Sequence, residues 1–444
     1  MTHTSPLYLR LLAPEFTRSA TARPLIDSAL PDLEHTSQDD LLTLLDALVE
    51  QHAWLHAQGD MAQLAQQQDS VARLYEKLLK SETASSHWRQ LSGWICLQQA
   101  QILFEQNSPE ALELIQRALQ DFESLEQDEG PNAENQGGLC CSLEMLASYH
   151  YQIDALQEAE RALRRSLDAL PKLIQMAAQD SLAQQLFVRQ LLLQHAIGDL
   201  GGDRAACKEA LLRAQQQLDL IQASPANQIS LREQRSEVQF LLGRLQFLSD
   251  EHGAAIKLLQ DALDQAQALA QDAPSEEASA AIGVRARMLG KVLVFADQVD
   301  MAMPHLQHSR SIFVELCAVT PAPLNWVEEL GESEEALARA QHIARREDLA
   351  LPHIEAAQAM FKRCALRAPK NPLLQLALLR LQLLHAQCLQ AMRRSDEARQ
   401  LLNKAMAQLR SLTRAPAAGV RQQAQTMLDM MEQTRAELQG KRSN

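Results

Sequence analysis

The chain has 444 residues, of which 46% are hydrophobic, 22% charged and only 4% aromatic, and its formal net charge is −14. Leu, Ala, Gln and Glu predominate and all favour helices, whereas the residues typical of strands are scarce. A chain this acidic lacks the basic surface that nucleic-acid phosphates require, so we expect no nucleic-acid partner.

The cysteines and the apolar runs bear on the compartment. Seven cysteines are present, an odd number, and most of them fall within helical patterns. That usage is typical of a reducing compartment, where cysteine behaves as a small hydrophobic side chain. The N-terminus lacks the features of a signal peptide, and no apolar run approaches the roughly 18 residues of a membrane helix. The sequence therefore predicts a soluble cytoplasmic protein without membrane insertion.

The chain divides into three stretches. Residues 1–36 contain four prolines that interrupt any long helix, so an N-terminal arm or cap is predicted there. Ser37 has the character of a helix N-cap, and helical periodicity continues from it through residue 410. Residues 411–444 predict a capping helix, polar on its outer side, and a tail. The central stretch, 37–410, is predicted to form one continuous array.

Small residues recur at a fixed interval within this array. Gly243 and Gly290 each follow a leucine and are 47 residues apart, and small residues stand 12 and 19 positions after each of them. The equivalent small sites elsewhere are positions 53, 100, 147, 195 or 196, 338 and 386, so that the interval is 47 or 48 throughout. A small residue at one place on a helix lets a second helix cross it closely. Such a period indicates a stack of helical hairpins that share one core.

Local signals suggest where individual helices begin and end. Ser108, followed by Pro and Glu, predicts a helix start. The acidic, glycine-containing stretch 124–138 predicts the longest break in the array, and Pro171 is expected to close the third hairpin. Asp300 and Asp348 are expected to be N-caps of two second helices.

The pattern small–x11–small–x6–small, with Asp or Gly-Asp turns, resembles the tetratricopeptide repeat (TPR) family across most of the chain. The resemblance implies an all-α fold, a right-handed superhelical α-solenoid of about eight helix–turn–helix units. The repeat is longer than that family's usual length of about 34 residues, so helices of about 20 residues are predicted. Long repeats of this kind, with a first helix like LASYHY, resemble arrays found beside bacterial serine/threonine kinases. HEAT-type repeats, whose length also fits, are the alternative.

No catalytic motif is complete. His52 and His56 have the spacing of a zinc-peptidase motif but lack its glutamate. The glycines at 283 and 290 only faintly resemble a phosphate-binding loop, because their spacing is wrong and no Ser or Thr follows the lysine. Histidines cluster at positions 305, 308, 342 and 353, although a metal site also demands a defined geometry and supporting side chains. The sequence therefore predicts that the chain is not an enzyme and has no metal or cofactor.

The predicted function is recognition. The leading hypothesis is a protein–protein interaction scaffold or adaptor that holds a peptide or helix of another protein in a concave groove. A second hypothesis is a regulatory sensor whose curvature changes when a ligand or peptide binds. A third, an enzyme built on a helical scaffold, has no motif behind it. The sequence does not indicate an oligomeric state.

The groove hypothesis names particular side chains. Positions −6, −3, +1, +4 and +5 from each small site lie on one arc of the first helix, and the TPR resemblance implies that this arc lines the groove. The residues predicted to bind a peptide are Arg244, Arg287, Lys291, Arg339, Arg380, Phe240, Phe247, Phe295, Trp54, Trp94 and Tyr151. Arginine forks suit carboxylates, so an acidic segment or a C-terminal carboxylate of the partner is expected. The alternative is that these cations pair with nearby acids such as Glu237, Glu332 and Glu335.

Overall fold

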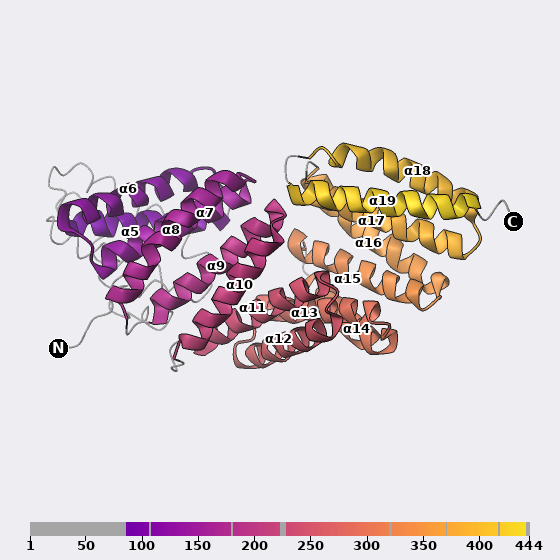
Figure 1. Cartoon of the computed structure of the whole chain (residues 1–444), viewed down its shortest axis with the longest axis horizontal. Coiled ribbons are helices and arrows are strands. Elements are labelled where there is room, and N and C mark those ends of the chain that lie inside the picture. Colours follow the sequence, from indigo (N-terminus) through magenta and orange to yellow (C-terminus); the bar gives the residue numbers. More distant parts are fainter. Residues whose placement is uncertain are drawn as a thin grey trace. The chain divides into compact units, whose positions relative to one another are not determined.

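The computed structural model describes residues 86–105, 108–178, 181–222, 228–318, 322–369, 371–415 and 418–440. These residues form fifteen α-helices and no strand (Figure 1). The helices are α5 (Ser86–Glu105), α6 (Ala111–Glu129), α7 (Ala133–Gln152), α8 (Leu156–Met176), α9 (Ser181–Gly201), α10 (Arg204–Leu220), α11 (Gln228–Leu248), α12 (His252–Asp272), α13 (Glu276–Phe295), α14 (Val299–Leu316), α15 (Leu324–Ile343), α16 (Glu347–Arg367), α17 (Pro372–Ala391), α18 (Ser395–Leu412) and α19 (Ala418–Gly440). The predicted all-α class is confirmed.

The chain divides into two compact units. The first comprises residues 1–197 and 213–231, and the second comprises residues 198–212 and 232–444. In the second unit, α13 packs on α14, α15 on α16 and α17 on α18, and the first helices α13, α15 and α17 also contact one another in sequence order. Helix α19 packs on both α17 and α18, as a terminal helix that covers the last hairpin would do. The array of eight hairpins over 37–410 stays a prediction, because its first hairpin lies outside the described residues.

The spacing of small residues corresponds to the core of the hairpins. Ala100, Ala147, Ala338 and Ala386 are fully buried, and so are the facing alanines at positions 255, 262, 350, 357, 398 and 405. A Cβ added to Gly290 would lie 2.5 Å from Cδ2 of Leu306, so the helices approach here as closely as a glycine allows. Helix lengths run from 17 to 23 residues, which confirms the expected length of about 20. The small site at position 53 lies outside the described residues.

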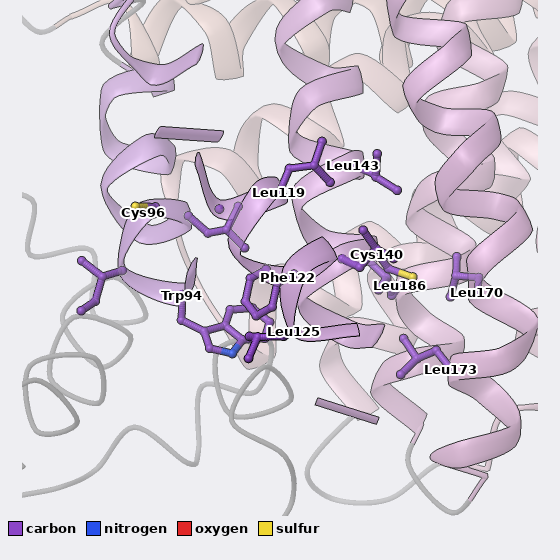
Figure 2. Packing of buried hydrophobic residues seen from close by; sticks show 14 of the residues in the cluster. Trp94, Cys96, Leu119, Phe122, Leu125, Cys140, Leu143, Leu170, Leu173 and Leu186 are labelled. Carbon is purple, nitrogen blue, oxygen red and sulfur yellow. The ribbon is translucent and has the colours of Figure 1, made fainter. Parts of the chain in front are cut away.

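A second close contact, absent from the sequence prediction, recurs within the hairpins. Figure 2 shows Phe122 of α6 beside Trp94 of α5, and their ring centroids are 5.1 Å apart in an edge-on arrangement. A Cβ on Gly93 would lie 2.6 Å from the Phe122 ring, so the ring occupies the space that this glycine leaves. Gly283 accommodates Phe313 in α14, and Gly331 accommodates Phe361 in α16, in the same way. All three phenylalanines are fully buried, so they hold the two helices of a hairpin together at a second contact, separate from the one at the small site.

Two predicted interruptions of the helices are wrong. Helix α6 continues to Glu129 and α7 begins at Ala133, so the break expected over 124–138 shrinks to three residues. The glutamates before Gly130 are good helix formers, and the Asn132 side chain caps α7 by accepting hydrogen bonds from two backbone amides. Pro171 does not end α8, which runs on to Met176. Buried Leu170 and Leu173 hold the helix on both sides of the proline, and this packing outweighs the missing hydrogen bond.

The turn follows one backbone pattern in six hairpins, from α7–α8 to α17–α18. Its left-handed residue stands seven positions after the small site and is Asp154, Gly202, Asp250, Asp297, Arg345 or Arg393, with φ between 59° and 77°. The second helix starts soon after it, so Asp300 and Asp348 lie in the first turns of α14 and α16 and are not N-caps as predicted. Their carboxylates still face the positive end of the helix dipole.

Replacing Gly290 by leucine tests the helix crossing. The added side chain meets Leu306 and the Ala302 carbonyl, so we expect the free energy of unfolding to fall by about 3 kcal/mol, measured by chemical denaturation. Gly253→Ala is the matched control, because this helical glycine has nothing within 4 Å of an added Cβ. Alanine there should raise stability by up to about 1 kcal/mol. Equal effects of the two substitutions would contradict a close crossing at Gly290.

Candidate functional site

The residues predicted to bind a peptide lie on the first helices of the hairpins, apart from Trp54, which is outside the described residues. They are Trp94 on α5, Tyr151 on α7, Phe240, Arg244 and Phe247 on α11, Arg287, Lys291 and Phe295 on α13, Arg339 on α15 and Arg380 on α17. Since α13, α15 and α17 are neighbours in the second unit, the structure brings four of the five cations onto adjacent helices.

Glutamates of α15 pair with several of these cations. Arg380 reaches back from α17 to Glu332 and Glu335, at 2.6 Å from each carboxylate. The ion pair between Arg339 and Glu335 is longer, at 3.3 Å. From the other side, Arg287 of α13 is 2.5 Å from the carboxylate of Glu329 and also donates to its backbone carbonyl. These contacts correspond to the internal pairing that the sequence offers as the alternative to a binding role.

The charges around Glu332 shift one another's pKa values. Burial alone would raise the pKa of Glu332, but Arg380, Lys291 and Arg287 outweigh that effect and lower it to about 2. Burial also acts to lower the pKa of Arg380, yet the two carboxylates it contacts raise the pKa above its usual value. Burial lowers the pKa of Lys291, whose ion pair with Glu332 is long, at 3.8 Å. We therefore interpret Glu332 as the electrostatic centre that joins α13, α15 and α17.

A more accessible group lies at the ends of α11 and α13. Phe247 and Phe295, which we call the aromatic pair, pack edge to face with ring centroids 5.2 Å apart. Phe295 is 49% exposed. One turn earlier stand Arg244 on α11, whose side chain is 39% exposed and 3.8 Å from Asp199, and Lys291 on α13. The two cations have only long ion pairs and adjoin exposed apolar surface.

Other predicted residues are less accessible. Trp94 is 1% exposed and belongs to the core of the first unit, so its ring presents no surface to a ligand (Figure 2). Phe240 is also buried, beneath the guanidinium of Arg285, which lies 5.3 Å from the ring centroid. Tyr151 is half-buried against the cluster around Ala147. The binding roles of these side chains stay predictions, and the aromatic pair offers the more open surface.

Arg285 is a buried charge that the sequence analysis did not single out. Its guanidinium donates to Ser236 and Glu237, at 2.9 Å each. Burial lowers its pKa, against the opposing effect of Glu237. The repeat could have revealed this residue. The equivalent positions in the neighbouring first helices are Val238 and Ser333, neither of which carries a charge, so an arginine at this position is an exception. Glu237 thus pairs with Arg285 rather than with a predicted binding residue.

Two classes of site are absent from the part of the chain that the structure describes. No group of three or more His, Cys, Asp or Glu side chains there could hold a metal ion. No helix among the described residues is both long enough and apolar enough to cross a membrane. His52 and His56 lie outside that part.

Glu332→Gln tests the ionic network. Because the folded-state pKa of Glu332 lies near 2, below its ordinary value of 4.5, ionisation stabilises the fold above pH 4.5. The stabilisation is lost as the pH falls from 4.5 through 2. We expect the variant to be less stable than wild type by about 2–3 kcal/mol at pH 7, with a gap in melting temperature that narrows below pH 4.5. Glu432→Gln, at an exposed position of α19, is the control. A gap that does not change with pH would contradict the assignment.

Comparisons with known proteins identify the fold. No family model and no curated protein matches the chain. Among solved structures, the apo form of the quorum sensor NprR from B. thuringiensis aligns with 87% of this chain and 98% of its own, at 11% identity and a TM-score of 0.51. The apo form of RapI aligns with 90% and 98%, at 10% identity and a TM-score of 0.49. A signal transduction ATPase with a tetratricopeptide repeat sensor, from Pyrococcus horikoshii, aligns with 88% of this chain and 53% of its own, at 13% identity and a TM-score of 0.43. At these identities the likeness shows the fold alone. The similarity to kinase-associated arrays therefore stays a prediction. The fold is that of a TPR-like α-solenoid.

Proposed function

We propose that this chain is a non-enzymatic interaction scaffold or adaptor that binds a peptide or helical segment of a partner protein. The observation that carries the proposal is the aromatic pair, Phe247 and Phe295, flanked by Arg244 and Lys291. The cytoplasmic location and the lack of a nucleic-acid partner stay predictions from the sequence.

The chemistry of these four side chains suits a segment with both apolar and acidic residues. A half-exposed aromatic ring supplies contact area that a partner can remove from water, and aromatic side chains dominate the energy of many interfaces. The ion pair between Arg244 and Asp199, 3.8 Å long at a partly exposed site, is weak, so exchanging its carboxylate for one of the partner costs little. Lys291 stays beside Glu332 and adds positive potential. Arg287 and Arg380 have short ion pairs and would lose more by such an exchange.

A regulatory sensor is the second candidate. NprR, a protein called a quorum sensor, has a fold like that of this chain over nearly its whole length. A sensor must differ in structure or order between its free and bound states, whereas an adaptor need not. Small-angle scattering with and without a purified partner distinguishes the two, because only a sensor should change its radius of gyration by more than the bound mass requires.

Reversing the two loosely paired cations tests the binding face. We expect Arg244→Glu with Lys291→Glu to weaken association with the native partner at least tenfold, or about 1.4 kcal/mol. The partner is first identified by pull-down from the native host with mass spectrometry, and its affinity is then measured at two salt concentrations. Wild-type binding should weaken with salt, because exposed charges are screened. Phe295→Ala should weaken binding without changing that salt dependence.

The control makes the same charge change elsewhere. Lys257→Glu with Lys362→Glu alters exposed lysines on the second helices α12 and α16. Arg287 is not used, since its reversal would break a short ion pair with Glu329. Because Lys291 lies 3.8 Å from Glu332, the melting temperature of the double variant is measured as well, so that a loss of stability is separated from a loss of binding. Equal binding by wild type, the Arg244 and Lys291 double variant and the control would show that this face is not the site.

A further inference from the structure

The left-handed turn position changes its residue type along the array. In four described hairpins the residue is Asp or Gly, the types that tolerate this conformation best, whereas the last two hairpins have Arg345 and Arg393. Arginine tolerates a positive φ less well than aspartate or glycine, and the other four hairpins form the same turn with those residues. A local preference violated twice at one register points to a role for the side chain.

Both arginines line a single cavity in the second unit. Its volume is about 1010 Å³, and it lies among the ends of α15 and α17, the starts of α16 and α18, and one side of α19. Met392 and Met430 supply apolar surface and are 40% and 45% exposed. The cavity thus combines two cations on neighbouring turns with two adaptable apolar side chains.

The two arginines retain their hydrogen-bonding capacity. Neither side chain forms a hydrogen bond or ion pair within the described part of the chain, and both are exposed. Two carboxylates also line the cavity, but each has another neighbour. Glu347 is buried, 3.4 Å from His342, and Glu437 accepts a hydrogen bond of 3.4 Å from Gln390. Among the charged side chains of the lining, the two guanidinium groups are therefore the ones without a hydrogen-bond or ion-pair partner in the described residues.

We propose that this cavity binds an acidic segment of a partner protein that also carries an apolar side chain. Arg345 and Arg393 receive the carboxylate through charge-assisted hydrogen bonds, and Met392 and Met430 receive the apolar group. The inference rests on the proposed function for the class of ligand, but it assigns a second site. Its residues, on the turns of the last two hairpins and on α19, are all different from those of the aromatic pair.

The change of residue type also directs the ligand. Asp250 and Asp297 occupy the same turn position in the two preceding hairpins of the second unit, where a carboxylate of the ligand would be repelled. At this turn position a carboxylate is therefore attracted in the last two hairpins and repelled in the two before them. A ligand of the aromatic pair would accordingly place its acidic residues toward Arg244 and Lys291 and away from the two aspartates. A basic segment would have the opposite preference.

Methionine methyl NMR provides a local measurement. The full chain is labelled at its methionine methyl groups and titrated with a short alternating Glu–Leu peptide, acetylated and amidated. We expect the signals of Met392 and Met430 to shift, and the affinity to fall as salt rises. The same peptide with a free C-terminus distinguishes a terminal carboxylate from a side-chain carboxylate by which form binds more tightly. A Lys–Leu peptide and inorganic phosphate are run in parallel.

The test variant is Arg345→Asp with Arg393→Asp, which introduces the residue found at this position in three other hairpins. Aspartate suits the left-handed turn, so we expect an unchanged or higher melting temperature together with at least tenfold weaker binding of the Glu–Leu peptide. Arg367→Asp with Arg410→Asp is the matched control, since both arginines are exposed and lie in the last turns of α16 and α18, away from the cavity. It should bind like wild type.

Three outcomes would overturn the proposal. They are an absence of Met392 and Met430 shifts in wild type at peptide concentrations of about 1 mM, equal shifts with the Lys–Leu peptide or with phosphate alone, and equal losses in the test and control variants. The Arg244→Glu and Lys291→Glu variant should keep these shifts. The two proposals can thus fail separately. The cavity is tested by the binding of the Glu–Leu peptide, whereas the aromatic pair is tested by the affinity for the native partner.

Discussion

The close crossing of the two helices in each hairpin is the constraint on which the other features depend. Where a glycine or alanine stands at the crossing, the helix presents no bulky side chain, and Leu306 of the facing helix fits into the space left by Gly290. Because each crossing fixes the register of one helix against the next, side chains at equivalent positions recur in equivalent surroundings. The interval of 47 or 48 residues in the sequence is therefore a direct record of packing in three dimensions.

That register explains where the charges meet. First helices lie side by side in the second unit, so positions −6, −3 and +1 of one helix face those of its neighbours. Glu332 thereby contacts Arg380 on α17 and lies 3.8 Å from Lys291 on α13. Each cation that an internal glutamate holds tightly is less available to a partner. The accessible part of the predicted binding surface is consequently reduced to the ends of α11 and α13, where the acid partners are distant.

The sequence predicts best what depends on one side chain and its period. Small residues mark the crossings because nothing larger fits, and the helix length follows from the interval. The contact between Gly283 and Phe313 was not predicted. The two residues are 30 positions apart on different helices, and the sequence around each of them does not indicate the other. The interruption expected at Pro171 was wrong, because the buried neighbours Leu170 and Leu173 pack the helix on both sides of the proline. Whether an arginine binds a partner or a glutamate depends on distances across helices, so the sequence could only offer both alternatives.

Turn residues are the least constrained part of each repeat, and this freedom is what makes their identity informative. The backbone at the turn requires only a residue that tolerates a positive φ, a demand that aspartate and glycine meet. Substituting arginine there leaves the crossings unchanged while it exchanges a negative charge for a positive one at a defined point beside a cavity. Along the second unit the series Asp250, Asp297, Arg345, Arg393 therefore changes sign once, between Asp297 and Arg345. A repeat protein can in this way bind a ligand in one orientation. Its periodic core could not do so by itself, because its repeats are alike at both ends of the array.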